Sequence, residues 1–183
     1  RVLFNRALPR EEQIEIIGDA LAPLFEYAYQ APEFAALLLT LPDNDQLFDR
    51  LENEEILPLY QLKREVEVGL AKRFSTQWKA LYTHYQEDSV AARAIKNVAL
   101  RYLSHLPDEA ELAVIQYAQA DNMTDINAAL IALLTNQNPQ AETIMQNFYQ
   151  RYQEDALLVD RYFALLGGIP HLTMDDVAMI SAH

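Results

Sequence analysis

The histidines are the first residues to test for chemistry, because a helical zinc hydrolase site needs two imidazoles one turn apart, as in His-Glu-x-x-His. The chain has His84, His105, His171 and His183, and no two of them stand three or four residues apart. None has a glutamate beside it. We interpret each as a surface or partly packed imidazole, so the sequence predicts no zinc ligand among them.

Other reactive patterns are missing from the sequence as well. It has no cysteine, no Gly-x-Ser-x-Gly motif and only four glycines, none in a phosphate-binding loop. Its acidic pairs fall at expected helix starts and polar turns, where negative charge is favoured. Asp121, Asn122 and Asp125 lack the central glycine and the glutamate at position twelve of a calcium loop. We therefore predict no catalytic, no cofactor-binding and no metal-binding residue in this chain.

The run Asn122-Met123-Thr124-Asp125 has a structural interpretation instead. Thr124 can cap a helix, and Asp125 falls in the first turn, where a carboxylate suits the helix dipole. We predict a structural helix cap formed by Asn122, Thr124 and Asp125. Arg101 interrupts an apolar face, and we expect it to pair with an acid from a neighbouring helix.

The tyrosines and phenylalanines cluster late in their expected helices, which is typical of a core with wet hydroxyls. A peptide-binding groove is the alternative interpretation of this set, which comprises Tyr27, Tyr29, Tyr82, Tyr85, Phe148, Tyr149, Tyr152, Tyr162 and Phe163. The net charge of −13 argues against nucleic acid and against an anionic membrane surface as partners. No apolar run approaches the roughly 20 residues of a membrane span.

The elements that must position these residues are predicted to be helices throughout. Apolar residues four apart form a ladder over 55–86, which predicts one long helix: Leu62, Val66, Leu70, Phe74, Trp78 and Tyr82. Before it, we expect a helix after Pro9 that Pro23 bends or splits, a short helix over 32–41, and another over about 43–51.

After residue 86 the expected helices are short, and their links are shorter still. Asp88 or Ser89 caps the first of these helices, whose inward-facing residues are expected to be Val90, Ile95, Val98, Tyr102 and Leu106. Asp108 and Glu111 have the spacing of a capping box, which predicts the start of the next helix. Further helices are expected over 109–120, 125–136, 139–154 and 156–166, and from about 173. Short links force antiparallel neighbours. The fold class is therefore all-α, with antiparallel helical hairpins stacked as an α-α superhelix of the HEAT or armadillo type.

We expect a single all-helical domain over 1–183, irregular over 1–86 and built of regular hairpins over 87–183. Arg1 is neither an initiator methionine nor the small residue normally exposed after methionine removal. We expect the chain to be a fragment of a larger C-terminal domain.

Several segments of the sequence resemble the C-terminal helical domain of bacterial aminopeptidase N, the zinc-dependent gluzincin alanyl aminopeptidase family. They are Asn-Val-Ala-Leu-Arg-Tyr-Leu at 97–103, Ala-Asp-Asn-Met-Thr-Asp at 120–125 and Leu-Val-Asp-Arg-Tyr-Phe at 158–163. The resemblance implies a non-catalytic domain that caps the active site and limits access of peptides. Zinc and the catalytic residues are expected in earlier domains, so we carry none of them onto this chain.

The resemblance also implies partners and a compartment. The expected partners are the catalytic zinc domain and peptide substrates of the parent protein. The family and the missing cysteines favour a cytoplasmic location. Exposed apolar surface on such a piece predicts self-association. The alternative function is a free-standing helical-repeat scaffold that binds a peptide or protein, although the apolar start of the chain disfavours it because a scaffold needs polar capping repeats.

Overall fold

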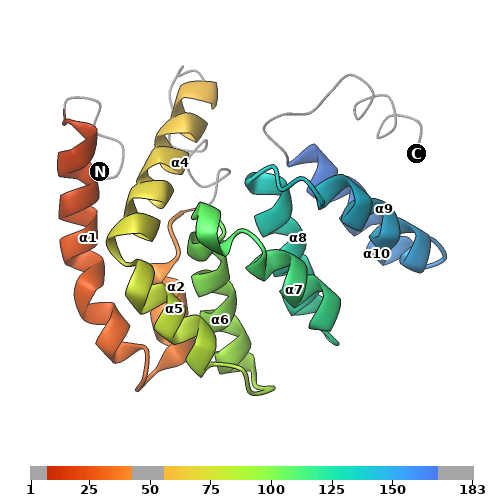
Figure 1. Cartoon of the computed structure of the whole chain (residues 1–183), viewed down its shortest axis with the longest axis horizontal. Helices are drawn as coiled ribbons and strands as arrows, with labels where there is room; N and C mark the ends of the chain where they lie inside the picture. Colours follow the sequence, from red (N-terminus) through yellow and green to blue (C-terminus); the bar gives the residue numbers. More distant parts are fainter. Residues whose placement is uncertain (1–7, 43–55, 169–183) are drawn as a thin grey trace. The chain divides into compact units, whose positions relative to one another are not determined.

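A computed structural model describes residues 8–42 and 56–168. Every element in these two ranges is helical, which confirms the all-α prediction (Figure 1). The helices expected over 43–51 and from 173 lie outside the described residues. The elements are α1 (Arg10–Tyr27), α2 (Pro32–Leu39), α4 (Ile56–Arg73), α5 (Ser75–His84), α6 (Val90–Leu103), the 3-10 turn η1 (Pro107–Glu109), α7 (Leu112–Gln119), α8 (Met123–Thr135), α9 (Ala141–Tyr152) and α10 (Ala156–Gly167).

The chain forms two compact units, Arg1–Glu109 and Ala110–His183. The boundary therefore falls after η1, whereas the sequence suggested that irregular helices give way to regular hairpins near residue 87. The reason is α6, which packs closely against α5 and α2 and so belongs with the helices that precede it. That all 183 residues act as one domain stays a prediction.

The ladder of apolar residues is buried as expected, but its helix is not continuous. Leu62, Val66 and Leu70 lie on α4, Trp78 lies on α5, and the helix breaks at Phe74, so the prediction of one helix over 55–86 is wrong. Phe74 has φ −113° and ψ 26°, outside helical values. Tyr82, the last member of the ladder, is only half-buried.

Helix α1 packs across the break. The ring of Phe25 on α1 contacts both Phe74 and Trp78, with centroid distances of 4.8 and 4.6 Å. Phe74 and Trp78 stand four residues apart, so their rings lie on the same face on either side of the break. Ser75 starts the new helix, and serine competes for backbone hydrogen bonds, which favours a helix end there. Helix α1 itself continues through Pro23, so the expected split does not occur.

Helix α6 completes the core of the first unit. Its Tyr102 ring stacks on Trp78 at 4.2 Å, and its hydroxyl donates to the Leu39 carbonyl of α2 at 2.9 Å. Ser89 caps α6 by accepting from the Ala92 amide, as predicted. Val90 was expected to face inward but is 65% exposed. It occupies the first helical position, on the opposite face from Ala92 and Ile95, which are buried.

After α6, two helix starts differ from the predicted ones. The capping box of Asp108 and Glu111 does not form, because η1 takes up Asp108 and α7 starts only at Leu112 without a side-chain cap. Helix α9 starts at Ala141 rather than at Pro139. Asn138 instead closes the turn before it, accepting from the Gln140 amide at 2.9 Å and donating to the Ala110 carbonyl at 3.2 Å.

The late tyrosines hold α9 and α10 together. Tyr149 lies 5.0 Å from Tyr162 and 6.4 Å from Phe163, and Phe148 lies 5.0 Å from Tyr152. Phe148 and Tyr162 are buried. These two rings are core, as the first of the two interpretations predicted, whereas Tyr149, Tyr152 and Phe163 are half-buried and Tyr152 borders an open pocket at the end of α9.

Candidate functional site

A buried charged cluster joins α4 to α6 in the first unit. Arg101 Nη2 donates to Glu67 Oε1 at 2.6 Å, which confirms that Arg101 pairs with an acid from a neighbouring helix. His105 Nε2 lies 3.6 Å from Glu67 Oε2, a separation too long for a hydrogen bond. The side chains of Glu67 and His105 are 6% and 1% exposed. The interpretation of His105 as a surface or partly packed imidazole is therefore wrong.

The cluster favours an ionised glutamate. Burial raises the pKa of Glu67, but the neighbouring His105 imidazole and the charges of Arg101 and Lys63 outweigh burial and hold that pKa below its ordinary value. Burial and the Glu67 charge likewise raise the pKa of the Tyr102 hydroxyl. Glu67 is therefore an anion at neutral pH and not a poised general base, which suits a structural role better than catalysis.

Metal binding was also tested against the geometry. Within residues 8–42 and 56–168, no group of three or more histidine, cysteine, aspartate or glutamate side chains could hold an ion. His84 is exposed and packs its ring against Tyr29 and Tyr85. His171 and His183 lie outside the described residues. The cluster of Glu67 and His105 offers two ligands at most, fewer than a structural or catalytic zinc site uses.

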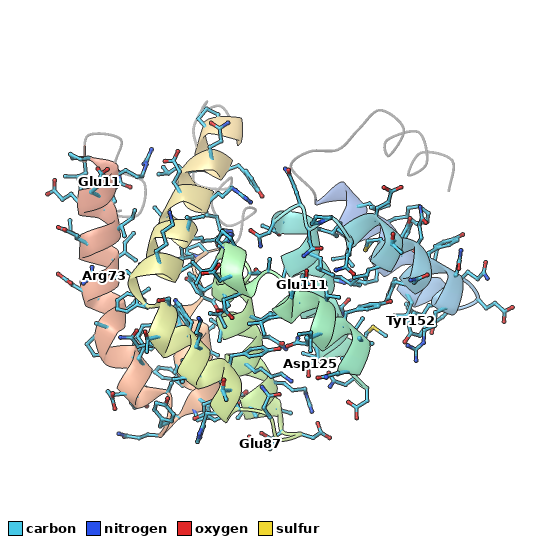
Figure 2. The ribbon with its side chains drawn as sticks, in the orientation of Figure 1. Glu11, Arg73, Glu87, Glu111, Asp125 and Tyr152 are labelled. Carbon is cyan, nitrogen blue, oxygen red and sulfur yellow. The ribbon has the colours of Figure 1, made fainter. Side chains whose placement is uncertain are left out.

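The 122–125 run forms a helix cap at the start of α8. Asn122 is the capping residue, and its Oδ1 accepts from the Asp125 amide at 2.9 Å. Asp125 is buried, and its carbonyl accepts from Gln116 Nε2 on α7 at 3.0 Å. Thr124, which the sequence suggested as a cap, is already inside the first turn and exposed. Asn122 is the cap because the helix starts two residues earlier than expected, at Met123. This run thus fixes the α7–α8 hairpin (Figure 2 labels Asp125).

An open apolar groove of about 880 Å³ lies between α2 and α6. Only one of its lining residues carries a charge, and the lining consists of Ala31, Pro32, Glu33, Phe34, Ala36, Leu37, Thr40, Ala91, Ala94 and Val98. Large apolar side chains stand at its edge: Leu37 is 70% and Phe34 is 53% exposed. Since such patches mark interaction surfaces on small domains, the groove is the best candidate for a binding face.

Sequence reasoning missed both the groove and Glu67. In the apolar run 35–39, only Ala35, Ala36 and Leu39 are buried. Helical periodicity would have placed Leu37 and Leu38 on the opposite face. The sequence indicated only weakly that Glu67 is buried and paired: it directly follows the ladder residue Val66 and stands four residues after Lys63.

Comparison with known proteins places this arrangement in a family. Residues 4–183 match the family model described as "Domain of unknown function (DUF3458_C) ARM repeats". Aminopeptidase N of Escherichia coli K12 is 28% identical over 150 residues, which cover 76% of this chain and 17% of that protein. Aminopeptidase N of Haemophilus influenzae is 26% identical over 171 residues, covering 90% and 20%. The chain thus spans about a fifth of the length of these relatives.

A solved structure shows the same fold. The crystal structure of Legionella pneumophila aminopeptidase A in complex with aspartic acid superposes with a TM-score of 0.78 at 18% identity, covering 99% of this chain and 25% of that one. This likeness supports the predicted superhelix of armadillo-type hairpins. Among the described residues, no helix is long and apolar enough to cross a membrane. The chain belongs to the DUF3458_C armadillo-repeat family and corresponds to the C-terminal helical part of aminopeptidase N.

Proposed function

We propose that the chain is the non-catalytic helical domain of a zinc-dependent aminopeptidase, where it covers the active site and limits access to peptides. The observation that carries the proposal is the family match over residues 4–183, in a chain that spans only about a fifth of its aminopeptidase N relatives. The remaining four-fifths of such a protein offers ample room for the catalytic residues.

The geometry of the described residues supports a non-catalytic role. The buried carboxylate of Glu67 pairs with Arg101 and is held as an anion. The Asn122–Asp125 contact is a helix cap. The proposed partners are the catalytic zinc domain and the peptides that it cleaves, with zinc bound outside this chain and the whole protein in the cytoplasm.

The first test uses the chain alone. We expect no hydrolysis of an alanyl anilide substrate, with or without added zinc. We also expect no zinc to remain bound after gel filtration, as measured by atomic emission. Bound zinc at one equivalent, or turnover that survives repurification, would overturn the assignment as a non-catalytic domain.

The second test uses the longer protein that carries this chain. Its activity would be compared with and without residues 4–183, on a single-residue anilide and on an unfolded polypeptide of about 100 residues. If the domain restricts access, its removal raises the ratio of polypeptide to anilide cleavage. An unchanged ratio, with the anilide activity retained, contradicts the covering role. A chain that binds peptides tightly by itself would instead favour the scaffold alternative.

A further inference from the structure

We draw no further inference here: the strongest candidate, the open apolar groove between α2 and α6, has a lining that would suit any apolar partner, and nothing in the structure shows what covers it.

Discussion

At the residue scale, the Asn122 cap is the contact that most directly links a sequence motif to local structure. Its side-chain oxygen satisfies the Asp125 amide, one of the donors left without a partner at a helix start. Because this bond is lost on truncation, Asn122→Ala should destabilise the chain by about 1 kcal/mol in urea unfolding.

Thr124→Ala provides the control for this cap. Thr124 is exposed within the first turn, so its truncation should change the free energy of unfolding by less than about 0.5 kcal/mol. A larger effect at Thr124 than at Asn122 would mean that the helix starts two residues later, at Asp125.

Glu67 makes the stability of the first unit depend on pH. Its pKa is lowered in the folded chain, so its ionised form stabilises the fold at pH values above the ordinary glutamate range. That contribution is lost as the pH falls through the folded-state pKa. We expect Glu67→Gln to be less stable than the parent chain at pH 7 and to show a smaller loss between pH 7 and pH 3.5 in urea titrations.

Removal of the partner cation tests the same pair from the other side. Arg101→Ala leaves the Glu67 carboxylate buried beside His105, and should cost about 2 kcal/mol at pH 7, less than for a fully buried pair because Arg101 is 35% exposed. Arg93→Ala breaks an exposed pair with Asp88 and should cost less than about 0.5 kcal/mol. Equal costs for the two variants would contradict a special role for the buried pair.

At the element scale, two glycines allow α1 and α4 to approach closely. A Cβ at Gly69 would lie 2.4 Å from Ile14 Cδ1, and one at Gly18 would lie 2.4 Å from Arg73 Nη1. Arg73, labelled in Figure 2, in turn donates to the Glu15 carbonyl and to Asp19 on α1. The close approach of α1 and α4 therefore depends on glycine at both contact positions.

Gly69→Ala is expected to destabilise the first unit. Crowding against Ile14 costs about 1–3 kcal/mol, and the better helix propensity of alanine offsets about 1 kcal/mol of it. The net loss should be about 1 kcal/mol in thermal or urea unfolding. Gly167→Ala is the control: nothing lies within 4 Å of its added Cβ, so it should be neutral or stabilising. A stabilised Gly69→Ala chain would show that the two helices have room to separate.

At the element scale, some predictions from the sequence are confirmed and others are wrong. The core assignment is confirmed for four ladder residues, Leu62, Val66, Leu70 and Trp78, because apolar residues four apart lie on one helix face and that face is buried. The break at Phe74 was not predicted, because the apolar ladder runs through it without interruption, although Ser75 was a local signal for a helix end. The prediction of a capping box at Asp108 was wrong where a tertiary contact is made: Glu109 pairs with Lys79 of α5 while η1 forms.

At the scale of the whole molecule, charge dominates solution behaviour. The net charge of −13 keeps copies apart at neutral pH, and it vanishes near the sequence pI of about 4.6. The contribution of Glu67 to stability declines on the way to low pH as well. We expect turbidity at 350 nm to be highest near pH 4.6 at about 0.15 M salt and absent at pH 8. A solution that stays clear at pH 4.6 and precipitates only below pH 3 would contradict this account.

The sequence by itself determined the helical class, the apolar ladder, a cap at Asp88 or Ser89 and the pairing of Arg101 with an acid. These features depend on local periodicity and on the chemistry of single residues. The amino-acid sequence of three short segments also indicated the correct family. Tertiary structure alone decided that Glu67 is the partner of Arg101, that His105 is buried beside them, and that Leu37 faces an open groove. Such features depend on which helices meet, and packing between residues distant in the chain determines that.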